Sequence, residues 1–361
     1  MNRFVSYLWV LMIITGFSAG FYWNMGKLFS HELSAQVFSP PIINQAPIIA
    51  EESLGAILEK IKKPNAKILF VGDTMLGRNV ASLSKKYGAD YPFANIKDFL
   101  AGFDFISANL EGPIVKTPQV AAINSMQFSF ASQSAEALKK NYIDLVFLAN
   151  NHTLNMGQAG LKQTKEYLEK QGIGFAGDPL KCGPELAYGK DNFIFLSFNQ
   201  TFFSGCKDLE FVTTVKEIKT KNPDKFIIIN MHWGQEYQPT NTKVQEDLAH
   251  ALIDSGADLI IGHHPHVVEN IELYKNKLIF YSLGNFIFDQ YFNQKVQQSL
   301  AVKFESNNQE FIYKLYPLIS QKSQPSLMET QAANKFLIDL AAISSADLSN
   351  SITSGQITLK K

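Results

Sequence analysis

Seven short apolar runs, spread between residues 67 and 288, constrain the fold of this chain more than any other feature. They read KILFVG, FDFISANL, DLVFLAN, NFIFLSF, FIIINMHWG, DLIIGHH and KLIFYSLGNFIF. Runs of this length, rich in β-branched and aromatic residues and bounded by glycine or polar residues, are typical of buried strands. The chain therefore has the material for a large sheet core.

Amphipathic segments lie between several of these runs. Residues 134–141, 158–171 and 243–255 carry apolar side chains at intervals of three and four, which predicts helices. Alternation of strands and helices predicts an α/β fold, and the strand-rich stretch 271–318 predicts some antiparallel pairing. With 361 residues, 46% of them apolar, one main domain is the simplest organisation.

The boundaries of that domain follow from changes in pattern. Strand-like runs begin at residue 67, so we expect the domain to occupy 67–325. Residues 27–66 are irregular and interrupted by prolines, as in a spacer. Residues 326–361 hold one apolar helix candidate, 332–343, and otherwise a polar ending, so we expect a C-terminal tail there.

The N-terminal region, 1–26, predicts a membrane anchor. Phe4 to Met25 contains no charged residue and has the length of a membrane-spanning helix. Arg3 on its N-terminal side favours a cytoplasmic start, which would place the rest of the chain outside the membrane. A cleaved signal segment, giving a secreted protein, is the alternative.

Charge and cysteine content exclude several classes of protein. Lys plus Arg and Asp plus Glu number 33 each, so no basic surplus exists to bind nucleic acid, and attraction for an acidic partner must be local. Cys182 and Cys206 fit no CxxC metal pattern. They form either one disulfide, which an oxidising compartment would favour, or two buried thiols.

Side chains able to bind metal follow five of the predicted strands. Open α/β sheets bind ligands at the carboxyl ends of their strands. Carboxylate, imidazole and carboxamide groups together suit Mn, Fe or Zn, whereas calcium would require more oxygen ligands. The residues at these strand ends are Asp73, Glu111, Asn151, His152, His232, His263, His264 and His266.

Each of these residues also has a structural interpretation. Asp73 could cap a helix that starts near Leu76, and Glu111 could shape the turn at Gly112. Arg78 is a candidate for holding a phosphate or carboxylate through two hydrogen bonds, or else an ordinary ion-pairing arginine. We expect His263 to be structural, because only alternate imidazoles of the HHPH turn project together.

Six ordered blocks resemble the CapA family of bacterial capsule and poly-γ-glutamate synthesis proteins, within the calcineurin-like metallophosphatase superfamily. They are GDTMLGR, NLEGP, ANNHTLNMG, MHWGQEY, GADLIIGHHPHV and YSLGNFIFDQ, within residues 67–290. The resemblance implies a four-layer α/β/β/α sandwich that holds one or two divalent metal ions.

The same resemblance implies a role for each site residue. Asp73 and His266 would bind the first metal, and Glu111 would bridge the two ions. His152 would be the catalytic residue, acting as an acid or transition-state donor. Apart from the resemblance, Glu236 and Tyr237 are candidates to support the ligands if metals bind. The ligands implied for the second metal are Asn151, His232 and His264.

Two positions depart from the family pattern. Met75 stands where related phosphoesterases have a metal-binding histidine, which predicts a weak or empty first site. Asn155 stands where the family has aspartate, which removes a carboxylate able to orient a neighbouring side chain.

The resemblance implies an extracytoplasmic protein that handles an anionic envelope polymer such as poly-γ-glutamate. One hypothesis is a metal-dependent hydrolase or transferase acting on a phosphoester or amide. The other is a non-catalytic component that binds polymer and assists a synthase and export complex. A secreted nucleotidase would need a base-binding domain after Gln290, which the sequence does not suggest.

Overall fold

A computed structural model describes residues 67–119, 122, 125–201 and 204–361. The predicted anchor at 1–26 and spacer at 27–66 lie outside the described residues. Contacts divide the chain into two units, 1–62 and 63–361, and only the second is described here. Within the described residues, every helix falls short of the length or apolar character that crossing a bilayer requires.

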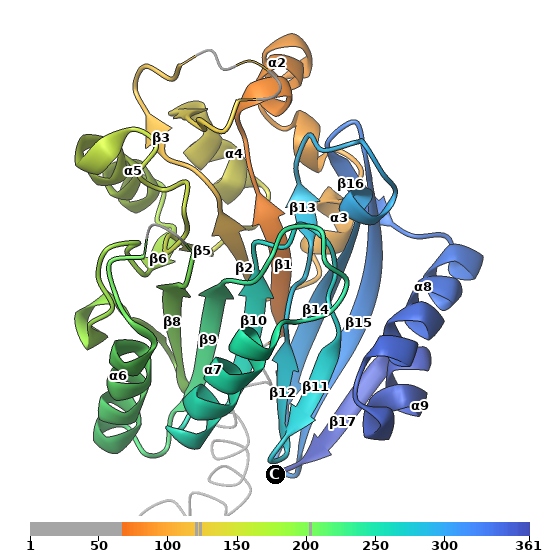
Figure 1. Ribbon diagram of the computed structural model, residues 1–361. Helices are drawn as coiled ribbons and strands as arrows, with labels where there is room; N and C mark the ends of the chain where they lie inside the picture. The colour runs from red at the N-terminus through yellow and green to blue at the C-terminus, as the bar shows by residue number, and fades with distance from the viewer. Residues whose placement is uncertain (1–66, 120–121, 123–124, 202–203) are drawn as a thin grey trace, which may run out of the picture. The chain divides into compact units, whose positions relative to one another are not determined.

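The first sheet contains nine strands (Figure 1). Its path runs β16-β15-β14-β1-β2-β5-β6; in addition, β13 pairs with β1 and β17 with β15. The strands β1, β2, β5 and β6 are parallel, whereas β14 to β17 pair antiparallel. Their bounds are β1 Ile68–Thr74, β2 Phe105–Leu110, β5 Leu145–Phe147, β6 Gly174–Ala176, β13 Asn285–Ile287, β14 Gln298–Ser306, β15 Glu310–Gln321, β16 Gln324–Leu327 and β17 Gln356–Lys360.

The second sheet contains six strands in the order β11-β12-β10-β9-β8-β7. Its four middle strands are parallel, and its two edge strands are antiparallel to their neighbours. Two further short strands, β3 (Ile114–Val115) and β4 (Phe130–Ala131), pair with each other. The bounds are β7 Tyr188–Lys190, β8 Phe193–Asn199, β9 Phe226–His232, β10 Leu259–His263, β11 Ile271–Tyr274 and β12 Lys277–Phe280.

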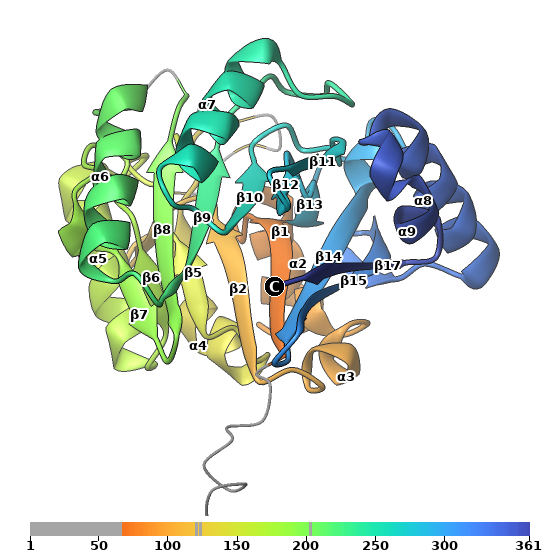
Figure 2. The ribbon, with the colours of Figure 1, turned by 90° about the horizontal axis from the view of Figure 1, so that it is seen from below.

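Helices cover the outer faces of both sheets (Figure 2). Four helices pack on the first sheet, and α6 and α7 pack on the second. The remaining two, α8 and α9, pack against β15 and β17. The bounds are α2 Arg78–Tyr87, α3 Lys97–Leu100, α4 Gln133–Lys140, α5 Gly157–Lys170, α6 Asp208–Lys221, α7 Lys243–Asp254, α8 Thr330–Ile343 and α9 Ser349–Thr353.

Alternation along the strands fixes this α/β/β/α order of layers. In β1, Leu69 and Val71 face the helices, whereas Ile68 and Phe70 face the second sheet. In β9, Ile228 faces the first sheet, and its neighbours on both sides face α6 and α7. Because successive side chains of a strand point to opposite faces, a strand buried on both faces reads as a continuous apolar run. This explains the runs that dominate the sequence.

Two expectations about chain organisation are resolved by the structure. The predicted C-terminal tail, 326–361, is instead part of the domain, because β17 pairs with β15 and Ile352 and Ile357 are buried in the core between the layers. Only every second residue of β17 is apolar and buried, so the sequence of this short strand resembles a polar ending. Cys182 and Cys206, left open above, form a disulfide.

Candidate metal centre

The predicted site residues converge because the parallel strands of both sheets end on the same side of the molecule (Figure 1). Asp73 is the second-to-last residue of β1, and Glu111 directly follows β2. His232 is the last residue of β9, and His263 is the last of β10. Asn151 follows β5, so the carboxyl ends of five strands from two sheets meet at one place, as ligand sites of open α/β sheets do.

The first group of side chains consists of Asp73, Glu111 and His266. Their ligand atoms all lie within 4.8 Å of one another, and all three residues are buried. His266 lies between the two acids, with Nδ1 at 3.3 Å from Asp73 Oδ2 and Nε2 at 3.8 Å from Glu111 Oε1. His263, expected to be structural, places Nδ1 at 3.2 Å from Asp73 Oδ1. Asp73, Glu111 and His266 thus form a group of three possible ligands for the first metal, although Met75 stands where related phosphoesterases have a metal-binding histidine.

The second group consists of Asn151, His232 and His264. His232 Nε2 lies 2.8 Å from Asn151 Oδ1, and the rings of His232 and His264 are 4.8 Å apart. Asn109 joins the two groups, because its Nδ2 donates to Asp73 Oδ1 at 2.8 Å and lies 3.3 Å from His232 Nδ1. All six predicted metal ligands are therefore neighbours in space.

Buried atoms without partners show that these residues fit a cation. Both carboxylate oxygens of Glu111 and Nδ1 of His264 are buried and accept no hydrogen bond within the described part of the chain. Buried polar atoms are otherwise almost always paired, and leaving one unpaired is costly. A divalent ion would satisfy them, and the mixed oxygen and nitrogen donors suit Mn, Fe or Zn.

Electrostatics divides the ligands into two kinds. Burial lowers the pKa of His232 well below its usual value and that of His264 to about 3, so both rings are neutral and able to bind metal. Burial would also lower the pKa of His266, but Glu111 and Asp73 outweigh it and raise the pKa to about 9. In the metal-free protein, protonated His266 therefore supplies the positive charge between the two acids that a bound cation would otherwise supply.

The two acids respond differently to the same environment. Burial raises the pKa of Glu111 to about 8. Burial would also raise the pKa of Asp73, but hydrogen bonds and positive charge from His263 and His266 lower it well below its usual value. Asp73 is thus a permanent carboxylate, whereas Glu111 and His266 hold protons that a cation would displace.

His152 is held with one ring nitrogen facing the centre. Its Nδ1 lies 3.0 Å from Asn155 Oδ1, its ring stacks on Phe128 with centroids 4.0 Å apart, and its Nε2 lies 3.7 Å from Glu111 Oε1. Asn155 therefore orients His152 despite lacking the carboxylate that the family pattern implies. Burial lowers the pKa of His152 to about 4, so the ring is neutral and Nε2 accepts a proton.

Arg78 is engaged within the protein. Its guanidinium forms an ion pair with Asp289 and donates from Nη1 to the carbonyl of Ser125 at 3.0 Å. It also stacks between Phe128 and Phe288. Only 6% of its side chain is exposed, so the structure places Arg78 in the ion-pairing arrangement rather than free to bind an anion.

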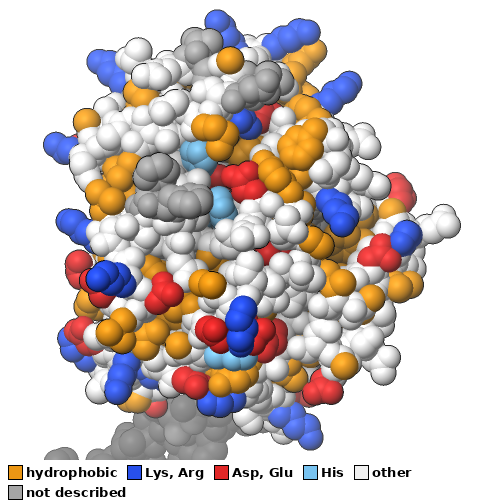
Figure 3. Space-filling view, viewed as in Figure 1, with side chains coloured by type: hydrophobic (Ala, Val, Ile, Leu, Met, Phe, Trp, Pro, Cys, Tyr) orange, Lys and Arg blue, Asp and Glu red, His pale blue; other side chains and the backbone are white. Residues whose placement is uncertain are grey.

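The mouth of the site is aromatic and acidic. Tyr237 accepts a hydrogen bond from Gln290 and packs its ring against the exposed Phe292 and toward His266. Glu236 is partly exposed, and its charge acts on both Glu111 and His266. Figure 3 shows histidine and acidic side chains together in the middle of this face, bordered by hydrophobic ones.

Sequence reasoning missed two asparagines that position ligands. Asn109 lies inside β2, where it reads as part of a strand rather than as a strand-end ligand. Asn285 lies in the run KLIFYSLGNFIF, and its Oδ1 lies 3.0 Å from His266 Nδ1. The position of Asn285 depends on the close approach of β13 to β1, where a Cβ on Gly72 would lie 1.9 Å from the carbonyl oxygen of Gly284, and no local sequence pattern indicates that contact.

Backbone strain also concentrates at this site. Among the described residues, ten that are not glycine have positive φ, and four of these are Arg78, Tyr237, His264 and His266. Such conformations cost on the order of 1–3 kcal/mol each and persist where surrounding structure enforces them, often at functional sites. At His264 and His266 this backbone conformation places the imidazole of His266 beside Asp73 and that of His264 beside His232.

Comparisons with known proteins give one consistent family. Residues 67–181 and 197–290 match the family model described as bacterial capsule synthesis protein PGA_cap. The chain is 32% identical to the capsule biosynthesis protein CapA of Bacillus anthracis over 71% of this chain and 67% of that protein. It is 28% identical to the PGA biosynthesis protein CapA of Bacillus subtilis, over 80% of each.

A solved structure of the purple acid phosphatase PPD1 from yellow lupin is a remote match. The two chains are 13% identical, and the match covers 55% of this chain and 48% of that one with a TM-score of 0.32. Similarity at this level says nothing about chemistry, so the site must be interpreted from its own residues.

Proposed function

Because this chain belongs to the family of bacterial capsule synthesis proteins, we propose that it acts in making or processing an anionic envelope polymer such as poly-γ-glutamate. The relatives from the two Bacillus species carry names that refer to capsule and PGA biosynthesis. A metallophosphatase-type fold and a metal-dependent hydrolase or transferase activity, at an amide or phosphoester, are parts of the same proposal.

The observation that carries the proposal is the buried, unpartnered carboxylate of Glu111 among five other metal-competent side chains. Asp73, Glu111 and His266 would hold one ion. Asn151, His232 and His264 would hold a second, with Glu111 between the two. A bound divalent cation would lower the pKa of a water molecule and polarise the bond under attack.

His152 would manage a proton in this reaction. Its Nδ1 donates to Asn155, so the neutral ring presents the lone pair of Nε2 to the centre. In this state His152 accepts a proton from the attacking group, and it can return that proton to the leaving group later in the reaction. Phe128 supports the ring by stacking, and Arg78 in turn supports Phe128.

The location of the protein is a further part of the proposal. We expect residues 4–25 to anchor it and the remainder to lie outside the membrane, with a cleaved segment as the alternative. The disulfide between Cys182 and Cys206 supports an oxidising compartment, because such bonds are rare in a reducing cytoplasm.

The second candidate is a non-catalytic accessory that binds polymer for a synthase and export complex. One observation favours it: Arg78, the arginine nearest the centre, already has Asp289 as its partner. A site that acted on an anionic chain would gain from a free arginine there. Under this hypothesis the metal would shape the surface rather than perform chemistry.

One experiment separates the two candidates. The full-length chain, purified in detergent, is analysed for metal and then assayed with Mn, Zn or Fe against poly-γ-glutamate and simple phosphoesters. Catalysis predicts metal-dependent turnover that His152→Ala lowers by about 100-fold or more, at unchanged metal content. His250→Ala is the matched control, since His250 lies on α7 beside Tyr274 and Glu272.

Other results would decide against catalysis. Turnover equal to the wild type in His152→Ala would remove that residue from the mechanism. Metal-loaded wild-type protein that binds the polymer but releases no product would favour the accessory role. Protein that binds neither metal nor polymer would contradict the whole proposal.

A further inference from the structure

A pocket of about 500 Å³ lies between α2, α4 and the chain on either side of β4. We propose that it binds a short segment of a carboxylate-bearing, amide-linked polymer while a neighbouring unit occupies the centre. This inference rests on the proposed function and assigns the place where the polymer is held. Its volume is in the range of pockets that enclose small ligands.

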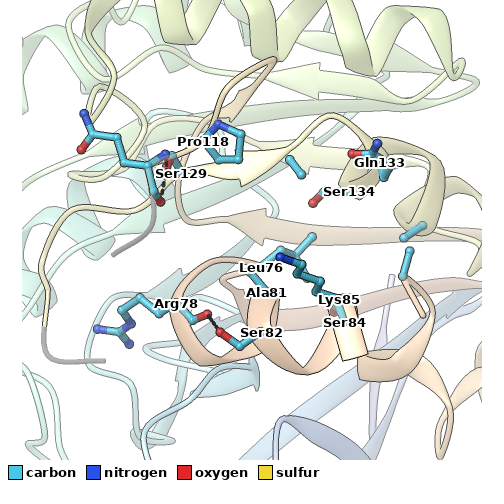
Figure 4. A pocket seen from close by; sticks show the side chains of 14 residues that line it. Leu76, Arg78, Ala81, Ser82, Ser84, Lys85, Pro118, Ser129, Gln133 and Ser134 are labelled. Atoms are coloured by element: carbon cyan, nitrogen blue, oxygen red, sulfur yellow. Dashed lines mark hydrogen bonds between the residues drawn. The ribbon is translucent and has the colours of Figure 1, made fainter. Parts of the chain in front are cut away.

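The walls of the pocket match a chain that alternates methylene, amide and carboxylate groups. Small apolar side chains, including Leu76, Ala81 and Ala137, would contact methylene groups. Hydroxyl and amide side chains, including Ser134 and Gln133, would exchange hydrogen bonds with amides. Figure 4 shows α2 with Lys85 on one wall and these two polar residues on the facing wall.

Charge in the pocket is of one sign. Arg78 and Lys85 are its charged lining residues, and no Asp or Glu is among the lining residues described. The charge of Arg78 is balanced by Asp289, whereas Lys85 makes no ion pair within the described residues. Lys85 is therefore the cation available to a ligand carboxylate, in a chain whose overall charge is balanced.

The composition of the walls argues against a nucleotide. Bases bind proteins largely by stacking on aromatic rings, and none of the described lining residues is aromatic. A phosphate chain would also call for more than one free cation. One available lysine among apolar and amide-binding groups suits a ligand with a single negative charge per unit.

Arg78 connects the pocket to the proposed chemistry. It lines the pocket, and its guanidinium lies 4.7 Å from the centre of the Phe128 ring. The same ring stacks on His152, so the pocket and the metal centre are separated by one stacked layer of side chains. A polymer held in the pocket would therefore reach the centre by passing around this layer rather than through it.

Two adjacent lysines on α2 provide the test. Both lysines are exposed, but Lys85 lines the pocket, whereas Lys86 does not line it and lies over the Tyr87 ring. The full-length chain is titrated with a fluorescent γ-linked glutamate oligomer and with the neutral γ-linked glutamine oligomer, following anisotropy. We expect Lys85→Glu to weaken binding of the acidic oligomer by about tenfold and Lys86→Glu to weaken it less than about twofold.

Further measurements keep the outcome clear. Ala81→Phe should fill the pocket and weaken binding of both oligomers, with unchanged metal content and melting temperature showing an intact fold. Equal effects of Lys85→Glu and Lys86→Glu, or unaltered binding by Ala81→Phe, would overturn the pocket assignment while leaving the proposed function in place. Wild-type protein that binds no acidic oligomer would overturn both.

Discussion

Metal binding should become tighter as the pH rises from about 6 to about 8, because two ligands of the first group hold protons in the metal-free protein. The pKa of His266 is raised to about 9 and that of Glu111 to about 8. A cation binds the deprotonated forms, and because each of these two groups affects the pKa of the other, it must displace between one and two protons in total. Each displaced proton makes the affinity for metal rise by about tenfold per pH unit. A plot of the logarithm of the affinity against pH should therefore have a slope between one and two.

Calorimetry in buffers of different ionisation enthalpy counts these protons directly. Titrating Mn or Zn into the full-length chain near pH 7 should release between one and two protons per ion at the first site. His266→Asn should bind more weakly and release about one proton fewer, whereas the control His250→Asn should match the wild type. Affinity that does not change between pH 6 and 8 would refute the assignment of His266 and Glu111 as ligands.

The same pKa values predict how stability responds to pH. Since both are raised in the folded chain, the metal-free fold holds protons that the unfolded chain has released. The stabilisation is present at low pH and is lost as the pH rises, through about 8 for Glu111 and about 9 for His266. The increase in melting temperature caused by metal should therefore be larger at pH 8.5 than at pH 6.5.

Three further predictions concern the framework of the site. Gly72→Ala should lower the free energy of unfolding by about 3 kcal/mol in urea titrations, because its Cβ would meet the carbonyl oxygen of Gly284 at 1.9 Å. Gly189→Ala, with open space around the new Cβ, should cost less than about 1 kcal/mol, and equal losses would contradict the close approach. Asp289→Asn should cost about 3–5 kcal/mol, because it leaves the buried charge of Arg78 without its partner; a loss below about 1 kcal/mol would show that the pair is dispensable. Reducing the disulfide, whose cysteines are 24 residues apart, should lower the free energy of unfolding by about 3 kcal/mol, and an unchanged urea midpoint would mean that the bond constrains little.

Much of the fold and the ligand set could be predicted, because both depend on local rules. Strands buried on two faces are apolar throughout, and parallel strands bring their carboxyl ends together. A reader of the sequence can therefore find Asp73, His232 and His266 without a structure. The helices at 134–141, 158–171 and 243–255 were confirmed to within one residue at each end, since their spacing alone specifies them.

Features that depend on lateral contacts could not be predicted in this way. Asn109 connects Asp73 to His232 only because two sheets stack and β2 lies beside β1. The partner of Arg78 is 211 residues away, and no local pattern indicates that pairing. The strand β17 is likewise stabilised by β15 rather than by its own sequence. Local patterns identify candidate ligands, whereas the groups that orient them depend on packing.

The cost of the buried polar groups bears on why the chain has this centre. An unpaired buried polar atom costs about 1–3 kcal/mol, and Glu111 alone has two of them. Replacing such a cluster by well-packed apolar residues is often neutral or stabilising. A fold that only presented an outer surface to a polymer would gain stability from that replacement. A bound cation would offset the cost of retaining two acids, five histidines and strained backbone at one point, whether the metal then performs chemistry or shapes a binding surface.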